Sequence, residues 1–327
     1  MNLQKRLRRR LAALAFGPQE LSPFCNLGLP DPQVDIKVWL VGRGAPRDVT
    51  GQNVIAATRP LVVGIGLEDH GDLNTISQNR LDLEFREGNP AQTLLGKIGV
   101  RLVDALKLER GKLLCLFRTH RPVNYCRPKS QVWRRYLHSA YAQWRKEWGP
   151  YPPEIRMVAS ELHALFIFYI CPRPVVLVSV VDGEAGSIFP MDLIGPIGCR
   201  HFSIALHTSS KALPLIDRSR RIALSSVPVE RIPLAYYLGK NHNKASVDWA
   251  SLPFSITTSS ALGLPIPKFS LRVREMEVAE LRYMASHAFV ICRVLEEYAV
   301  ADGLQFFQAH GFYEEWRKQA IPLPSTP

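Results

Sequence analysis

A four-residue run in the second half of the chain combines three hydroxyl groups with an ammonium group. Thr208, Ser209, Ser210 and Lys211 follow one another directly after an apolar run. A phosphate needs several hydrogen-bond donors and a positive charge held together, and hydroxyls, consecutive backbone N–H groups and a lysine supply both. The run therefore predicts a phosphate-binding turn. The alternative is a Ser/Thr cap on a helix over residues 211–218, with the lysine in solvent.

A second stretch able to contact a ligand lies shortly before this turn. Residues 174–181 are mostly apolar, Asp182-Gly183 breaks the run, and mostly apolar residues follow again from 185 to 192. This order predicts a β-hairpin. Because proline cannot donate to a sheet ladder, the second arm is expected to leave regular pairing at Pro190 and to offer its freed backbone to a ligand. An edge strand with a hydrophobic plug is the alternative.

This order of elements resembles the flavin reductase-like family of FMN-binding split β-barrels: an apolar strand, a hairpin, a further strand and a hydroxyl turn. The resemblance covers residues 170–318 and includes the strand at 221–227 and the run at 286–291. In that family the second hairpin arm lines the flavin ring and the hydroxyl turn holds the phosphate. The resemblance implies an FMN site formed by Ser187, Ile188, Phe189, Pro190, Met191, Asp192, Thr208, Ser209, Ser210, Lys211 and Ser225.

The same resemblance implies the activity, which is NAD(P)H-dependent flavin reduction with NADH or NADPH as the electron donor. Since the cofactor carries the hydride chemistry, the protein need only place the two nucleotides and exclude water. We therefore assign no catalytic residue. Two alternatives stay open: a flavoprotein that transfers single electrons or senses redox state, and a basic module that binds nucleic acid or a membrane surface without flavin.

Composition limits these alternatives. The chain has 327 residues, 46% of them hydrophobic and 21% charged, which is typical of a folded globular protein. Basic residues exceed acidic ones by 12, but outside a run at residues 5–10 they are mixed with acidic residues, which disfavours nucleic acid as the partner. No apolar stretch is long enough to span a membrane as a helix. The six cysteines occur singly, without zinc-type spacing, so we expect no metal site and a cytoplasmic protein with reduced thiols.

Short runs rich in Val, Ile and Leu dominate the chain, whereas longer helical patterns are few, at residues 130–147, 211–218 and 278–286. Many strands with few helices predict a mainly β fold with accessory helices. Three prolines at positions 150, 152 and 153 forbid regular structure and mark a boundary. We expect two domains, at residues 1–150 and 151–327.

The two halves also resemble each other. Five runs match in the same order: 38–41 with 175–178, 61–67 with the strand ending at 206, 83–87 with 271–275, 113–117 with 290–294, and 133–134 with 316–317. The offset between matched runs jumps between the second and third matches, which predicts an insertion there in the second half or a loss in the first.

The first half departs from the second at one important place. It carries Glu68, Asp69 and Asp72 where the second half has its hydroxyl turn, and carboxylates repel phosphate. We therefore predict tandem split β-barrels, the second complete and the first, at residues 35–145, reduced and without FMN. Such a chain would form an intrachain pseudo-dimer or associate with itself.

Overall fold

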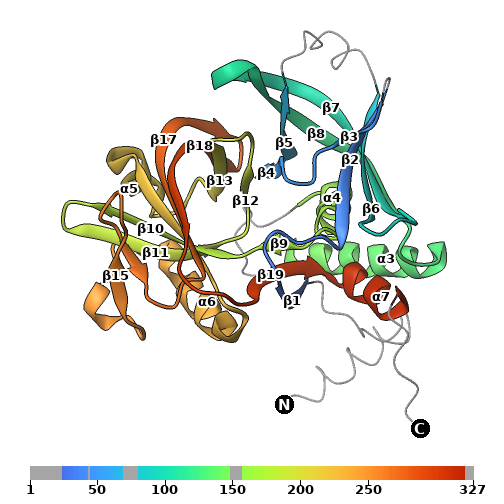
Figure 1. The fold of residues 1–327 in the computed structure, drawn as a ribbon. Helices are drawn as coiled ribbons and strands as arrows, with labels where there is room; N and C mark the ends of the chain where they lie inside the picture. Colours follow the sequence, from blue (N-terminus) through green and yellow to red (C-terminus); the bar gives the residue numbers. More distant parts are fainter. Residues whose placement is uncertain (1–23, 43–44, 69–79, 148–156, 321–327) are drawn as a thin grey trace, which may run out of the picture.

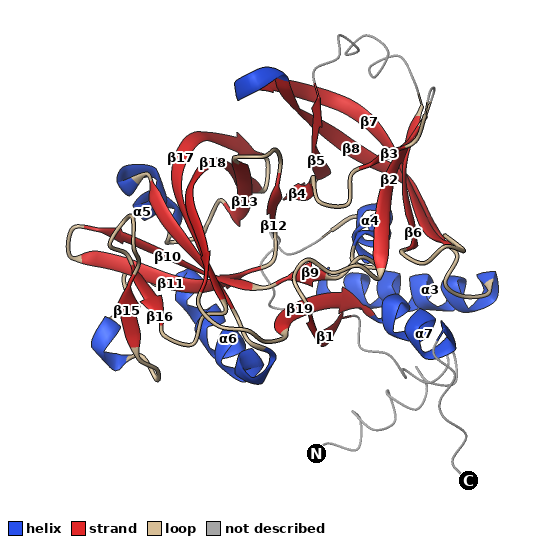
Figure 2. Cartoon of the chain, in the orientation of Figure 1, coloured by secondary structure: helices blue, strands red, loops and turns tan. Residues whose placement is uncertain are grey.

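A computed structural model describes residues 24–42, 45–68, 80–147 and 157–320 of this chain. Two antiparallel seven-stranded sheets dominate it (Figure 1), and helices lie around them (Figure 2). The predicted mainly β fold with accessory helices is confirmed. The basic run at residues 5–10, most of the acidic run at 68–72 and the expected boundary at 148–153 lie outside the described residues.

The first sheet has the strand order β3-β2-β6-β7-β8-β5-β4. Its strands are β2 (Ile36–Val41), β3 (Arg47–Asp48), β4 (Asn53–Thr58), β5 (Leu61–Glu68), β6 (Leu81–Glu87), β7 (Leu94–Leu108) and β8 (Lys112–Asn124). Side chains alternate between its two faces, so Val63 and Ile65 lie in the barrel core while Val62 and Gly66 face the second half.

The second sheet has the order β11-β10-β14-β17-β18-β13-β12, which repeats the first sheet position by position. Its strands are β10 (Val176–Asp182), β11 (Ala185–Met191), β12 (Ile194–Pro196), β13 (His201–His207), β14 (Arg221–Ser226), β17 (Arg272–Met284) and β18 (His287–Ala299). Residues 83–87 form β6, whose counterpart here is β14, so the predicted match to residues 271–275 is wrong by one strand. Short alternating runs fit neighbouring strands equally well. The extra chain of the second half therefore follows β14, at residues 227–271.

Two of the three predicted helices are found, as α3 (Lys129–Glu147) and α5 (Leu213–Ser219). The third prediction, at residues 278–286, is wrong because this segment continues strand β17. The pairing of β17 with β18 is irregular at Glu275/Met276 and at Val278/Glu280. Such bulges shift the inward and outward alternation by one residue, and the resulting spacing imitates that of a helix.

Residues 227–271 cover the outer face of the second sheet. They contain α6 (Ile232–Leu238), the 3-10 turns η3 (Val229–Arg231), η4 (Gly239–Asn243) and η5 (Trp249–Ser251), and the strands β15 (Ile256–Thr258) and β16 (Pro265–Pro267). Ala235 and Leu238 of α6 bury Leu177 and Ile188 of the sheet. This apolar layer requires apolar side chains on the outer face of β10 and β11.

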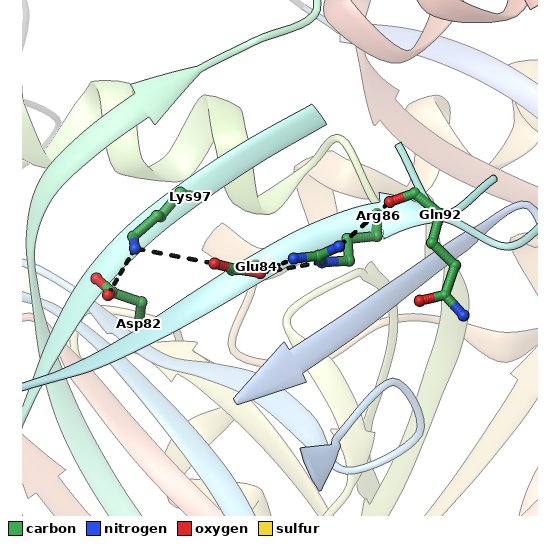
Figure 3. Close-up of polar contacts among 5 residues, drawn as sticks. All are labelled: Asp82, Glu84, Arg86, Gln92 and Lys97. Carbon is green, nitrogen blue, oxygen red and sulfur yellow. Dashed lines mark hydrogen bonds and ion pairs between the residues drawn. The ribbon is translucent and has the colours of Figure 1, made fainter. Parts of the chain in front are cut away.

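The corresponding face of the first sheet carries charges instead (Figure 3). Arg86 donates from Nε and Nη2 to one carboxylate oxygen of Glu84, at 3.0 and 2.6 Å, and Lys97 lies 2.8 Å from Asp82. Trp39 pairs across the strands with Glu84, where Leu177 pairs with Ser225 in the second sheet. The two sheets thus share their strand order but differ in what covers their outer faces.

Packing crosses the expected boundary at residue 150. Helix α4 (Ala159–Phe168) and helix α7 (Gly311–Ala320) both contribute to the core of the first barrel, through residues such as Ile167 and Phe312. A three-stranded sheet of β1 (Phe24–Leu29), β19 (Gln305–His310) and β9 (Arg173–Pro174) lies at the base between the barrels (Figure 1). Segments of the C-terminal half therefore complete the N-terminal one.

The barrels meet through equivalent strands. Val62 on β5 and Leu114 on β8 share an apolar cluster with Ala205 on β13 and Phe289 on β18. Strand β4 contacts β12, β13 and β18. The junction is therefore a buried apolar interface in which each barrel presents the same pair of strands to the other.

Candidate functional site

The hydroxyl turn, residues 208–211, connects β13 to α5 and lies beside the turn between β17 and β18. The backbone N–H of Thr208 donates to the carbonyl of Ser286 at 3.1 Å. Ser209 Oγ lies 2.7 Å from Nδ1 of His207. Ser210 is buried, and its hydroxyl has no hydrogen-bond partner among the described residues. Lys211 is exposed. The turn thus presents one unused buried hydroxyl next to an exposed ammonium group.

The alternative interpretation as a Ser/Thr helix cap does not match the geometry. Helix α5 begins at Leu213, its cap residue is Ala212, and no side chain bonds to the cap. Pro214 lies in the first turn of α5. The hydroxyls of the turn are therefore not used to terminate the helix.

The first half reaches the neighbouring turn between β17 and β18. The backbone N–H of Arg59, which follows β4, donates to Ser286 Oγ at 2.9 Å. The rings of His207 and His287 lie 5.4 Å apart, and Ser286 Oγ lies 2.8 Å from Nδ1 of His287. Burial, with a smaller contribution from His207, lowers the pKa of His287 to about 4, so this imidazole is neutral at pH 7. The turn between β17 and β18, next to the hydroxyl turn, therefore lies at the junction of the two barrels.

The hairpin arm behaves differently from the prediction. Strand β11 stays in regular pairing with β10 through Pro190, which lies opposite Leu177. Pro190 is tolerated because β11 is an edge strand, and its missing N–H would point to the free edge. The expectation that the arm leaves the sheet at Pro190 is wrong for this reason.

The free edge of β11 is covered by residues 239–247, which we call the strap. Asn241 Nδ2 donates to the carbonyl of Ile188 at 2.8 Å, and Nε2 of His242 bonds to the carbonyl of Pro190 at 2.9 Å. Val247 N–H donates to the carbonyl of Gly186 at 2.8 Å. These contacts protect the sheet edge and engage the backbone groups that the sequence suggested for a ligand.

Most side chains of the arm point into packed regions. Ser187, Ile188 and Phe189 have no exposed area, and Phe189 and Met191 belong to the core of the second barrel. Asp192 is half-buried and accepts a hydrogen bond of 2.6 Å from the Tyr169 hydroxyl, and burial raises the pKa of its carboxyl.

Ser225 lies on β14 at the centre of the sheet. It is fully buried between Leu177 and Val273, and its hydroxyl has no partner within the described chain. The structure therefore does not place Ser225 in the hydroxyl turn.

The strap joins the two predicted parts of the site. The backbone N–H of Lys211 donates to the carbonyl of His242 at 2.9 Å, while the His242 ring bonds to Pro190 and lies 4.6 Å from the ring of Phe189. The hydroxyl turn and the arm are thus close to each other, with the strap between them. Of the predicted contacts, Thr208, Ser209 and Lys211 are exposed, Pro190 and Asp192 are partly exposed, and the others are buried.

A cavity of about 820 Å³ lies elsewhere, at the mouth of the second barrel against the first half. It is lined by apolar side chains such as Val176, Phe202 and Leu224 and by the cations Lys37, Arg173, Arg272 and Arg274. Sequence reasoning missed it because its residues come from segments scattered along the chain. One signal was available: Arg272 and Arg274 are two residues apart on a strand and so share a face.

Within the described residues, no group of three or more His, Cys, Asp or Glu side chains is arranged to hold a metal ion. No described helix is both long and apolar enough to cross a membrane. The six cysteines are free thiols, and burial raises the pKa of Cys25 and Cys115 to about 11.

No family model matches the chain, and no curated protein does. Parts of solved structures are similar to it. An FMN-binding protein from Thermus thermophilus shares 21% identity over 39% of this chain and 71% of that chain, with a TM-score of 0.36. The styrene monooxygenase flavin reductase of Pseudomonas putida S12 shares 16% identity over 42% of this chain and 87% of that chain, with a TM-score of 0.36. The NADH:FAD oxidoreductase of Streptomyces globisporus C-1027 shares 13% identity over 49% of this chain and 95% of that chain, with a TM-score of 0.41. Each match covers less than half of this chain.

Proposed function

We propose that this protein binds FMN and acts in flavin-linked redox chemistry. The observation that carries the proposal is the hydroxyl turn, where the buried hydroxyl of Ser210 lacks a partner within the described chain and Lys211 lies exposed beside it. A phosphate supplies acceptors for both groups, because each of its oxygens accepts hydrogen bonds and its charge attracts an ammonium. The residues present therefore fit the phosphate of FMN.

The proposed contacts are Thr208, Ser209, Ser210 and Lys211. Because the strap occupies the free edge of β11, residues 187–191 act through packing, by holding the strap and the barrel core in place. Ser225 likewise supports the sheet from its buried position on β14. FMN supplies the hydride chemistry when it is bound, and the chain supplies position and shelter from water.

We further propose that NADH or NADPH delivers the electrons, as the resemblance to flavin reductases implies. No residue is assigned as a general acid, a general base or a nucleophile, because two bound nucleotides can exchange a hydride directly. A flavoprotein that exchanges single electrons with a partner would use the same FMN site, so the rate of NAD(P)H oxidation separates the two functions.

The two halves are proposed to descend from one duplicated barrel. The same strand order in both sheets and a junction built from equivalent strands support this origin. In such an intrachain pseudo-dimer, the first half serves as the second wall of the site, and Arg59 already reaches the turn next to residues 208–211.

Equilibrium dialysis against FMN, followed by absorption spectroscopy of the retained protein, tests the function. We expect retained flavin with visible bands and faster oxidation of NADH or NADPH than free FMN gives. Retained flavin without faster oxidation would favour the single-electron alternative. Absence of retained flavin at saturating FMN would overturn the proposal.

A further inference from the structure

The two barrels differ at their mouths. Helix α4 fills the mouth of the first barrel, whereas the mouth of the second barrel holds a cavity. In the first barrel, Phe168 of α4 packs against Phe85 with ring centroids 6.0 Å apart, and Ile167 lies against Gly96. Gly96 on β7 pairs with Phe85, whereas Arg274 on β17, the corresponding strand of the second sheet, pairs with Leu224. In the first barrel, Gly96 has no side chain and so leaves room for helix α4. In the second barrel, Arg274 lines a cavity of about 820 Å³. Small-molecule sites commonly have volumes of about 300–1,000 Å³.

The charge around this cavity is positive. Four cationic side chains line it, against the two carboxylates Asp31 and Asp48. Arg274 lies 4.2 Å from the Phe202 ring and donates from Nε and Nη2 to Glu297, at 3.1 and 2.7 Å. Its guanidinium is therefore already held by Glu297 and Phe202. Arg272 is only loosely paired, at 3.5 Å from Asp31 and 3.6 Å from Glu297. Its N–H donors can therefore turn to a ligand with little loss.

Arg173 adds a buried charge to the lining. It is only 6% exposed, and its Nη1 and Nη2 donate to the carbonyl and the Oδ1 atom of Asn53 at 3.2 and 2.6 Å. Asn53 carries no charge, and Nε of Arg173 has no hydrogen-bond partner in the part of the chain described. The guanidinium also lies 3.9 Å from the Phe168 ring and is attracted by the Asp192 carboxylate, which accepts its hydrogen bond from Tyr169. Because the hydrogen-bond partner of this buried guanidinium is neutral, an anion in the cavity would offset part of the cost of burying it.

We propose that this cavity binds an organic anion with an apolar body, such as an aryl carboxylate. Its apolar part packs against Val176, Phe202 and Leu224, while its acid group lies at the arginines, with Arg272 as the main donor. The hydroxyl turn contributes no residue to this lining, so the site stands apart from the proposed FMN site. The inference holds whether or not the protein binds flavin.

Titration calorimetry with two matched probes, 1-naphthoate and the neutral 1-naphthamide, tests the proposal. The wild type is expected to bind naphthoate at least about tenfold more tightly than naphthamide, since a charge-assisted hydrogen bond is made with the anion alone. Arg272→Gln should weaken naphthoate binding about 10- to 150-fold and leave naphthamide unchanged. Arg282→Gln is the control, because Arg282 is a similarly exposed arginine on the same strand that pairs with Asp104 and Glu280 outside the cavity.

A third variant tests the location. Leu224→Trp fills the apolar end and should abolish binding of both probes, and its circular dichroism reports whether it has folded. Lys211→Ala should leave naphthoate binding unchanged. The proposal would be overturned by equal affinity for the two probes, by an Arg272→Gln protein that binds naphthoate like the wild type, or by loss of naphthoate binding in Lys211→Ala.

Discussion

Gly66 on β5 lies directly against the backbone carbonyl of Ile197, so a glycine of one barrel touches the main chain of the other. A Cβ atom at this position would overlap the carbonyl oxygen, and the backbone cannot yield as a flexible side chain could. Gly66→Ala is expected to destabilise the protein by about 1–3 kcal/mol through overpacking of the junction. Gly51→Ala is the matched control, since a Cβ there meets no atom within 4 Å. Equal urea midpoints for the two variants would contradict the tight junction.

A second prediction concerns one of the polar contacts between the halves. Asn53 at the start of β4 accepts both hydrogen bonds of the buried Arg173 guanidinium. Asn53→Ala removes the shorter of them, and also the two bonds that Nδ2 of Asn53 donates to the carbonyls of Val49 and Thr50. The bond to the charged group alone contributes about 1.5–3 kcal/mol. We expect a loss of that size in the free energy of unfolding. Asn89→Ala, in an exposed turn, serves as the control and should change stability little. A stable Asn53→Ala protein would show that Arg173 has other support.

A third prediction concerns acid stability. Burial alone would raise the pKa of Glu275, but hydrogen bonds from the Ala261 and Leu262 N–H groups and from two serines lower it below its usual value. A carboxyl whose pKa is lowered by folding stabilises the protein above its unfolded pKa of about 4.3. That stabilisation is lost as the pH falls through the folded-state pKa. Glu275→Gln should therefore be less stable than the wild type at pH 7, and the gap should shrink towards pH 3.

Thermal unfolding of the two proteins between pH 7 and pH 3 measures this difference. Glu280→Gln, on the exposed part of the same strand, should follow the wild type at every pH. A gap between wild type and Glu275→Gln that stays constant with pH would mean that ionisation of Glu275 contributes nothing to stability.

The strand content and the position of the hydroxyl turn could be predicted from the sequence because both depend on local patterns. Runs such as residues 61–67 alternate or stay apolar over the length of one strand, and the turn is marked by four consecutive residues. The error at residues 278–286 arose from a bulge, which is invisible in a window-based pattern.

The strap and the cavity could not be predicted in the same way. Asn241 and His242 reach β11 from more than fifty residues further along the chain, as the separations of their hydrogen-bond partners show. Nothing in the local sequence of β11 indicates that its free edge is occupied. The cavity likewise depends on loops of the first half that close over strands of the second. Both features follow from tertiary packing, which spacing within one segment does not encode.

The proposed FMN site makes a specific prediction for one side chain. If the Lys211 ammonium pairs with the phosphate of FMN, Lys211→Ala removes a charge-assisted bond of about 1.5–3 kcal/mol and weakens FMN binding about 10- to 150-fold. Riboflavin lacks the phosphate, so its affinity should hardly change. Lys268→Ala, which removes an exposed lysine elsewhere in the second half, should leave both affinities unchanged. Raising the salt concentration should partly reproduce the loss in the wild type, because exposed charges are screened.

Fluorescence titration of FMN and riboflavin against the wild type, Lys211→Ala and Lys268→Ala is therefore the most direct measurement. Only the FMN affinity of Lys211→Ala should fall, by at least about tenfold, with riboflavin bound equally by all three proteins. Equal FMN affinity in Lys211→Ala and wild type would contradict it, and so would a parallel loss of both ligands, which indicates a loosened barrel.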